Sequence, residues 1–298
     1  MGQPASATTN TISFQGTRGA YSHQACAEVF PGMEALPCAT FEDAIAAVWE
    51  GRADLAMLPV ENSTYGRVAD IHHLLPESGL HIIGEHFLRV HINLLGVPGA
   101  RIEDIRAAMS HTVLLGQCRT FLREHGIAPR TGADTAGSAE IVAATGDRSL
   151  AGLASELAGE IYGLEVLARH IEDQKNNTTR FLVMAPRPRL AERGRDVLTT
   201  FVFRVRNLPA ALYKAMGGFA TNGVNMIKLE SYMVDGQFTA TQFYADIEGH
   251  PEDPAVARAF EELRYFTSSL RMLGTYPAHP YRREQALAER SRLAQPVG

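Results

Sequence analysis

The chain's first clear pattern is TISFQGTRGAYS at residues 11–22, where a strand-like run enters a glycine-bearing turn and then a helical pattern. The run Thr11–Gln15 holds apolar and β-branched residues, and the helical pattern extends from Tyr21 to Phe30. The same alternation follows in a strand at Glu34–Cys38, a helix near Phe41–Trp49 and a strand at Asp54–Val60. Repeated strand–helix units predict an α/β fold with a mixed or parallel sheet.

Outward from this stretch, the middle of the chain predicts a second α/β layer, inserted at about residues 92–170. A long β-type run, His81–Val97, leads into it. We expect helices near Ile102–Met109 and Val113–His125, a strand near Arg130, a helix near Gly137–Thr145, a strand at Leu150–Ala154, a helix at Ser155–Tyr162 and a strand at Val166–Ile171. A strand at Arg180–Met184 then returns the chain to the first sheet.

The Pro-rich, charged run that begins at Ala185 predicts a linker at residues 187–196. Beyond it, residues 197–276 predict the order βαββαβ of a ferredoxin-like domain. Its expected elements are the strand Leu198–Val205, the helix Ala210–Asn222, a hairpin of Val224–Val234 and Phe238–Ile247 turning at Asp235-Gly236, the helix Asp253–Ser269 and the strand Arg271–Tyr276. We expect residues 1–10 to be a disordered tail, and 277–298 a polar, helix-prone and loosely held one.

The composition is that of an ordinary globular protein. Of 298 residues, 45% are hydrophobic, and the formal net charge of −5 comes without a long run of like charges, which argues against nucleic acid or an anionic membrane as partner. No stretch approaches the roughly 18 apolar residues of a membrane span, and no signal-peptide pattern is present, so we expect a cytoplasmic protein. The widely spaced Cys26, Cys38 and Cys118 fit a reducing compartment and are expected to be core residues.

Polar residues recur where strands are predicted to end, which is where α/β proteins bind ligands. In Gly16–Ser22 the backbone N–H groups of the turn suit a carboxylate, although a plain turn with Ser22 as helix cap explains the pattern equally well. The next polar run is Glu61-Asn62-Ser63, directly after an apolar strand. A simple turn whose side chains bond their own backbone is the alternative there.

A third polar segment begins at Ser110-His111. Gln117 follows at close to two helical turns, so Ser110 is expected to cap a helix whose inner face presents Gln117. Neighbours at a helix start do not face each other, which argues against a serine–histidine nucleophile.

The fourth segment, Asn176–Phe181, leads into the last strand of the first sheet. It sets a hydroxyl, a permanent cation and an aromatic ring side by side. In an extended chain Thr179 and Phe181 share one face and Arg180 takes the other.

The sequence predicts neither a metal nor a nucleotide cofactor. His81, His86 and His91 have a spacing that fits neither a helical face nor a strand face, and no Cys or His cluster has zinc spacing. The glycine motifs that bind phosphates or dinucleotides are also absent.

Together these segments resemble the prephenate dehydratase family, and the resemblance covers residues 11 to about 276. Gly16–Ser22, Pro59–Ser63, Ser110-His111 with Gln117, and above all Asn177-x-Thr179-Arg180-Phe181 stand in that family's order and approximate spacing. The resemblance implies a catalytic region at 11–186, built of two α/β lobes like those of type II periplasmic binding proteins, and a regulatory ACT domain at 197–276. It implies a carbon–oxygen lyase of phenylalanine biosynthesis, which converts prephenate to phenylpyruvate as a homodimer or homotetramer without metal or organic cofactor.

The resemblance also implies roles for the polar segments. It assigns the donor for the departing hydroxyl to Thr179, with Glu61 as the rival if an apolar cleft raises its pKa. Arg180 is expected to hold the pyruvyl carboxylate, because pairing with the departing ring carboxylate would stabilise the substrate more than the transition state. The other expected substrate contacts are Ala20, Tyr21 and Ser22, the neutral donors Asn62, Ser63, Ser110 and Gln117, and Phe181, which shields the site from water.

The C-terminal segment is similar to ACT domains that sense phenylalanine, which makes L-phenylalanine the candidate effector. The allosteric residues that this implies are Ala211, Leu212, Asn225, Glu230 and Ser231. Two departures stand out, because Ala210 occupies a position where the family usually has glycine, and Tyr232-Met233 replaces Arg-Pro. A methyl group at Ala210 restricts the close approach of a ligand to the backbone.

Two other functions fit the same residues. Arogenate differs from prephenate only in an amine for the keto oxygen, so an arogenate dehydratase would use the same cleft. A non-catalytic regulator built of two lobes and an ACT domain would bind an amino acid without turnover. The Thr179-Arg180-Phe181 motif favours an enzyme over such a regulator.

Overall fold

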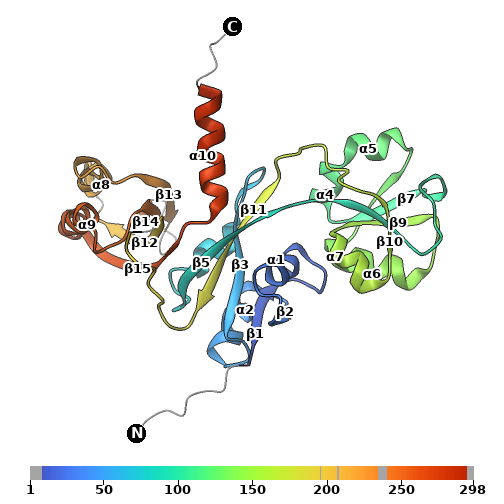
Figure 1. The fold of residues 1–298 in the computed structure, drawn as a ribbon, viewed down its shortest axis with the longest axis horizontal. Coiled ribbons are helices and arrows are strands. Elements are labelled where there is room, and N and C mark those ends of the chain that lie inside the picture. Colours follow the sequence, from blue (N-terminus) through green and yellow to red (C-terminus); the bar gives the residue numbers. More distant parts are fainter. Residues whose placement is uncertain (1–8, 195, 207, 234–239, 294–298) are drawn as a thin grey trace. The chain divides into compact units, whose positions relative to one another are not determined.

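The structure, a computed structural model, describes residues 9–194, 196–206, 208–233 and 240–293 (Figure 1). It divides into two compact units, of which the first holds the chain up to Val68 together with Leu88–Phe181. The second holds Ala69–Phe87 and the chain from Leu182 onward, so the predicted linker at 187–196 lies within it. In the described residues, no helix is both long and apolar enough to cross a membrane.

The first unit begins with a sheet of strands β2-β1-β3-β11, which we call the β3 sheet. β1 runs parallel to β2 and to β3, as the strand–helix alternation predicts. Ile12, Ser13 and Phe14 are all fully buried, so both faces of β1 are covered. The elements are β1 (Thr11–Gln15), α1 (Tyr21–Val29), β2 (Glu34–Cys38), α2 (Phe41–Trp49), β3 (Leu55–Asn62), the short β4 (Gly66–Arg67) and β11 (Thr178–Ala185).

β3 is longer than predicted, because it continues past Val60 to Asn62. β4 holds this extension, with Arg67 opposite Glu61 and Gly66 opposite Asn62. Glu61 and Asn62 are therefore strand residues rather than members of a free turn, and their side chains leave the strand on opposite faces.

The rest of the first unit forms a second sheet of order β10-β6-β9-β7-β8, which we call the β9 sheet. Its core is aliphatic, and Leu94, Leu95 and Leu153 are fully buried in it. The caps of two helices are side chains, since Asp134 accepts from the N–H of residue 137 and Ser155 from that of residue 158. The elements are β6 (Asn93–Gly96), β7 (Ala107–Ser110), α4 (Thr112–Gln117), α5 (Arg119–Glu124), β8 (Ala128–Thr131), α6 (Thr135–Thr145), β9 (Leu150–Ala154), α7 (Glu156–Tyr162) and β10 (Glu165–Ala168).

Two predictions for this region are wrong. Residues 102–109, expected as a helix, form a short 3-10 helix at Ile102–Asp104 and then the strand β7. β7 pairs with both β8 and β9, and this pairing outweighs the local helical pattern. The single helix expected at 113–125 is interrupted at Cys118, where φ is −119° and ψ is 22°, and so becomes α4 and α5.

The second unit contains an antiparallel sheet of order β13-β14-β12-β15, whose chain order β12-α8-β13-β14-α9-β15 is the predicted βαββαβ. The rings of Phe201, Phe219 and Phe260 pack together between this sheet and its helices. The hairpin turn expected at Asp235-Gly236 lies outside the described residues. The elements are α3 (Ala69–Leu74), β5 (His81–Arg89), β12 (Val197–Val205), α8 (Ala211–Thr221), β13 (Met226–Met233), β14 (Ala240–Glu248), α9 (Pro254–Phe266), β15 (Thr267–Pro277) and α10 (Pro280–Leu293).

Within the C-terminal segment that we expected to be loosely held, Pro280–Leu293 form α10, whose start has specific contacts. Arg282 donates from Nε and Nη2 to the two carboxylate oxygens of Glu85, at 2.6 and 2.8 Å. The Glu85 side chain is fully buried, and the ring of Tyr281 stacks on Phe87 at 4.8 Å between centroids. This pairing ties the first turn of α10 to β5.

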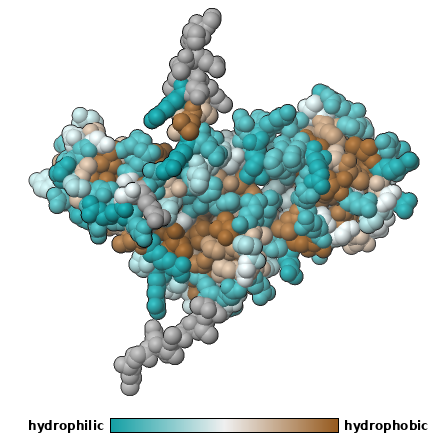
Figure 2. Space-filling view, in the orientation of Figure 1, coloured by the Kyte–Doolittle hydropathy of each residue, from teal (hydrophilic) through white to brown (hydrophobic). Residues whose placement is uncertain are grey.

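Most of the surface visible in Figure 2 is hydrophilic, with smaller hydrophobic areas between. Two large aromatic side chains of the second unit are exposed, Tyr213 at 81% on α8 and Tyr265 at 82% on α9. Exposed tyrosines on neighbouring helices are suited to contact another protein surface.

Candidate active site

The polar residues gather where β3 ends and β11 begins. Asn62 donates from its amide to Oδ1 of Asn177 at 2.7 Å and to Oγ1 of Thr179 at 3.0 Å. The amide oxygen of Asn62 accepts from the backbone N–H groups of Thr64 and Tyr65, which fixes the orientation of the amide. Since the oxygen of Thr179 accepts this hydrogen bond, its own O–H is left to donate in another direction.

Ser63 joins the same two strands. Its hydroxyl donates to the carbonyl oxygen of Asn176 at 2.6 Å and accepts from the N–H of Thr178 at 2.9 Å. Its backbone N–H donates to the carbonyl oxygen of Thr178. Ser63 therefore holds the start of β11 in place, and its contact with substrate stays a prediction.

Glu61 and Arg180 form an ion pair in the same place, with 2.9 Å between Nη1 and Oε2. The arginine side chain is 3% exposed and that of the glutamate 31%. Phe181, next along β11, is 1% exposed and belongs to the core beneath the site.

Ser110 and His111, predicted as site residues near the β9 sheet, belong to different elements. Ser110 ends β7, is fully buried and donates to the carbonyl oxygen of Leu153, while His111 caps α4 by accepting from the N–H of Val113. Our prediction that Ser110 caps the helix is therefore wrong, because the chain stays extended through Ser110 to pair with β8 and β9. Ser110 and His111 have separate partners and form no nucleophilic pair.

Gln117 ends α4 close to the segment that leads into β11. Its carbonyl oxygen accepts from the N–H of Asp173 at 2.7 Å, and the carboxylate of Asp173 accepts from the N–H of Thr120 at the start of α5. The side chain of Gln117 is 8% exposed, and its Oε1 has no hydrogen-bond partner among the described residues. A buried amide oxygen without a partner is costly, so it suits a donor supplied by a ligand.

Three backbone donors of the glycine-bearing turn already have partners within the protein. The N–H of Gly16 donates to residue 38, that of Gly19 to the ring of His23, and that of Ala20 to the carbonyl oxygen of Thr17. These three N–H groups are therefore engaged, and carboxylate binding by the turn stays a prediction.

The start of α1 is the part of this segment that remains suited to an anion. Ala20 occupies the N-cap, and within the described chain no side chain caps the first turn of α1. Ser22 lies inside the helix and is not the cap. The first N–H groups of a helix have no intrahelical partner, so those of Tyr21 and Ser22 suit a carboxylate.

One group near the site escaped the sequence analysis. The ring of His91 lies 3.9 Å from that of His170, its Nδ1 is 3.1 Å from Oε1 of the buried Glu172, and its carbonyl oxygen accepts from the hydroxyl of Tyr21. Burial raises the pKa of the Tyr21 hydroxyl well above its usual value. His91 lies between β5 and β6, and His170 and Glu172 lie between β10 and β11. Spacing along the chain carries no signal for such a group, because its members are about 80 residues apart.

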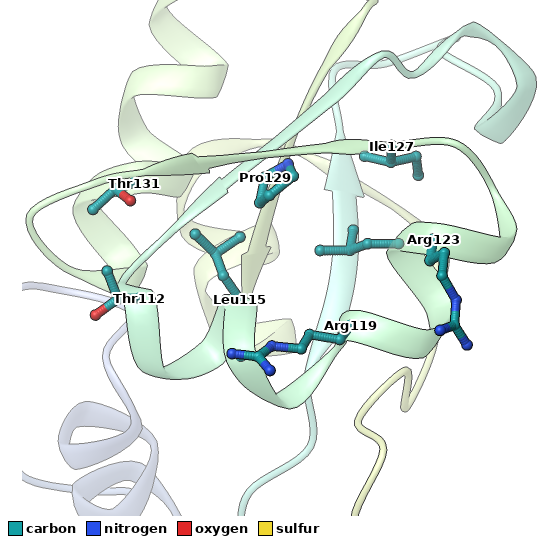
Figure 3. Close-up of a pocket in the computed structure, with 9 residues that line it drawn as sticks. Thr112, Leu115, Arg119, Arg123, Ile127, Pro129 and Thr131 are labelled. Atoms are coloured by element: carbon teal, nitrogen blue, oxygen red, sulfur yellow. The ribbon is translucent and has the colours of Figure 1, made fainter.

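A pocket of about 370 Å³ lies between α4, α5 and β8 (Figure 3). Its lining combines Leu115, Leu122 and Ile127 with the guanidinium-bearing Arg119 and Arg123 of α5. None of its lining residues belongs to the predicted site, so we assign it no part in the chemistry.

The predicted effector residues lie in the second unit. Ala210 is the N-cap of α8 and has φ of 60°, in the left-handed region. Ala211 and Leu212 follow in the first turn of that helix, and Asn225 precedes β13 and bonds to the carboxylate of Glu248. Glu230 and Ser231 lie on β13, and the carboxylate of Glu230 is 3.6 Å from the ammonium of Lys228.

The arrangement defines a class of protein. Neutral donors, an ion pair and an uncapped helix start, all at the ends of strands in an α/β unit, describe a site for a small anionic molecule. The chain belongs to the prephenate dehydratase family, because the family model described as "Prephenate dehydratase" matches residues 12–189.

Similar proteins agree with this membership. The chain is 53% identical over 274 residues to a bifunctional N-acyl-homoserine lactone acylase/prephenate dehydratase of Komagataeibacter europaeus, covering 92% of this chain and 98% of that protein. It is 39% identical to the chloroplastic arogenate dehydratase/prephenate dehydratase 1 of Arabidopsis thaliana, covering 89% of this chain and 71% of that protein. The crystal structure of a prephenate dehydratase from Arthrobacter aurescens in complex with L-Phe matches with a TM-score of 0.81 at 29% identity, covering 95% of this chain and 99% of that one.

Proposed function

We propose that this chain is a prephenate dehydratase, a lyase that removes water and carbon dioxide from prephenate to give phenylpyruvate in the cytoplasm. The observation that carries the proposal is the hydrogen bond from Asn62 to Thr179. It leaves the hydroxyl of Thr179 as a donor at the carboxyl end of β3. The two sheets of the first unit act as two lobes, and the substrate binds between them.

The chemistry requires a donor more than a base. The ring carboxylate leaves as carbon dioxide, its bonding electrons move into the ring, and the opposite C–O bond breaks to release hydroxide. A proton or a strong hydrogen bond at that oxygen lowers the barrier as its charge develops. Thr179 supplies this hydrogen bond, and the N–H of Asn62 that points at its oxygen makes the hydroxyl a better donor.

The two carboxylates of the substrate need different partners. We assign the pyruvyl carboxylate to the positive end of α1, at the N–H groups of Tyr21 and Ser22, together with Arg180. Arg180 already pairs with Glu61, so the substrate shares this guanidinium and does not neutralise it alone. The departing ring carboxylate is left without a strong cationic partner, which avoids stabilising the ground state.

Gln117 supplies the orienting contact from the β9 sheet. Its Oε1, which has no partner among the described residues, accepts a hydrogen bond from the substrate. The hydroxyl of prephenate is the group that donates this bond. Asn62 and Ser63 act through Thr179 and β11, and Ser110 through β9, so these three position the site.

The test is an assay of the purified full chain with prephenate and with arogenate at neutral pH. Phenylpyruvate formed from prephenate, well above the rate without enzyme, is the expected result. Turnover of arogenate alone would replace the proposal with arogenate dehydratase, which the Arabidopsis relative makes the second candidate. Binding of phenylalanine without turnover of either substrate would favour the non-catalytic regulator.

The second unit suits a regulatory role. We assign residues 197–276 to an ACT domain that binds an amino acid through Ala211, Leu212, Asn225, Glu230 and Ser231, with L-phenylalanine as the ligand to test first. The exposed Tyr213 and Tyr265 suit self-association of the chain as a dimer or tetramer. Light scattering of the purified protein measures that state directly.

The Komagataeibacter relative is also named as an acylase. Acyl transfer can use a serine activated by a histidine, but the adjacent Ser110 and His111 have separate partners in this chain. We therefore assign no acyl transfer to this pair.

A further inference from the structure

The glycine-bearing turn at residues 16–20 makes contacts that join the two sheets of the first unit. The turn contributes the side chain of Thr17 and the carbonyl oxygens of Arg18 and Gly19. Their partners are respectively the carboxylate of Asp134 at 3.3 Å, the hydroxyl of Tyr162 at 2.9 Å and the hydroxyl of Ser155 at 2.6 Å.

Packing and a fourth hydrogen bond reinforce these contacts. Gly19 has φ of +87°, and a Cβ there would lie 2.9 Å from both Cα and Cβ of Ala158, so only glycine fits. The ring of Tyr21 packs against the core of the β9 sheet while its hydroxyl donates to the carbonyl oxygen of His91. Side chains at the start of α1 and backbone atoms of the turn thus touch α7 and the segment that runs between the sheets.

The position of these contacts relates them to the site. The turn follows the carboxyl end of β1, while Asp134 follows β8 and Ser155 follows β9. The contacts therefore join the carboxyl-end edges of the two sheets, and Glu61–Ser63 and Ser110 lie on those same edges.

We propose that Thr17, Gly19 and Tyr21, with Asp134, Ser155 and Tyr162, form an interlobe clasp that sets how far apart the two halves of the active site stand. These are positioning residues, since they act through the placement of the α1 start and of Gln117. The effect on turnover rests on the proposed prephenate dehydratase activity, whereas the effect on lobe separation does not.

The clasp consists of four hydrogen bonds and one close contact between Gly19 and Ala158. The bonds of Thr17 and Tyr162 are exposed, so each of these two contributes modestly. Losing two of them lowers the fraction of molecules in the closed arrangement without altering the groups that meet the substrate. The apparent affinity falls by that fraction, so KM rises while kcat is nearly unchanged. A role limited to stability would lower the melting temperature and leave both KM and kcat unchanged.

The test compares the double variant Thr17→Val/Tyr162→Phe with a control, Thr145→Val/Thr267→Val. In the control, Thr145 loses a hydroxyl that bonds to the carbonyl oxygen of Val142, and Thr267 loses one that bonds to the carbonyl oxygen of Leu263. Spin labels are attached at Glu42→Cys and Glu140→Cys, two exposed positions, and report the distance between the lobes. The native cysteines are buried, so the label reacts with the two introduced ones.

We expect the clasp variant to show a longer and broader spin-label distance distribution and a KM for prephenate raised about tenfold, with kcat within about twofold. The control should match the parent in both measurements. An unchanged distance distribution, or a changed one with an unchanged KM, would overturn the clasp. If the parent does not turn over prephenate at all, the proposed function fails, and the distance measurement alone still decides whether the turn holds the lobes. Gly19→Ala, which forces the contact apart, should widen the distribution further.

Discussion

Asn62 shows how one side chain organises this site. Its amide group is held by two backbone N–H groups and in turn holds Asn177 and Thr179. Asn62 and the motif that contains Asn177 and Thr179 are both visible in the sequence. Their contact is not, since Asn177 and Thr179 lie 115 and 117 residues from Asn62. These hydrogen bonds support the positioning role that we propose for Asn62.

Replacing Thr179 tests the donor directly. Thr179→Ala removes the hydroxyl that assists departure of hydroxide, so kcat for prephenate should fall by about 10² to 10⁴ while KM stays within a few fold. Thr179→Ser keeps the hydroxyl and should recover most of kcat. Steady-state kinetics on both variants gives the answer, and an active Thr179→Ala enzyme would move the donor role to Glu61.

The three cysteines offer a second test of single side chains. Burial raises the pKa of Cys26 to about 12 and also raises the pKa of Cys38 and Cys118. Because the thiolate is the reactive form, all three should react with a disulfide reagent at pH 8 at least about 100-fold more slowly in the folded protein than after denaturation. Rapid modification of one thiol in the native state would show that it is accessible and would contradict its placement in the core.

Among the elements, those with a strong local pattern match their predicted ranges, whereas β7 and the end of β3 differ because strand pairing decides them. β1 and α2 fall within a residue of expectation, since apolar periodicity and the cap Thr40 specify them locally. β7 was predicted as a helix, because its strand state comes from pairing with β8 and β9. The extension of β3 through Asn62 was missed for the same reason, since β4 is what holds it.

The anchoring of α10 gives a prediction for one element. Glu85→Ala removes the fully buried carboxylate that binds Arg282, so the free energy of unfolding of the second unit should fall by about 2 kcal/mol. Arg283→Ala is the matched control, because the pair of Arg283 with Asp196 is largely exposed and its loss should cost less than about 1 kcal/mol. Urea denaturation of the full chain measures both, and equal losses would mean that the buried pair does not anchor the helix.

For the molecule as a whole, Ala210 connects backbone geometry with the effector site that we propose in the second unit. It adopts φ of 60°, in the left-handed region where glycine is favoured. Ala210→Gly should relieve about 1 kcal/mol of strain and raise the melting temperature by a few degrees. It should also strengthen the thermal shift produced by L-phenylalanine, measured against D-phenylalanine as control. An unchanged response to L-phenylalanine would mean that the methyl group does not limit the effector site.

Periodicity and turn residues were enough to predict the α/β class and the βαββαβ order near the C-terminus, because both are properties of neighbours along the chain. The candidate site residues were named from the resemblance of their motifs to a known family. Which side chains meet was settled by the packing of strands far apart in sequence: Asn62 with Thr179, Glu61 with Arg180, Tyr21 with His91, and the glycine turn with α7. Hydrogen bonds and ion pairs act over a few ångströms in space, and only the folded chain brings these groups within that distance.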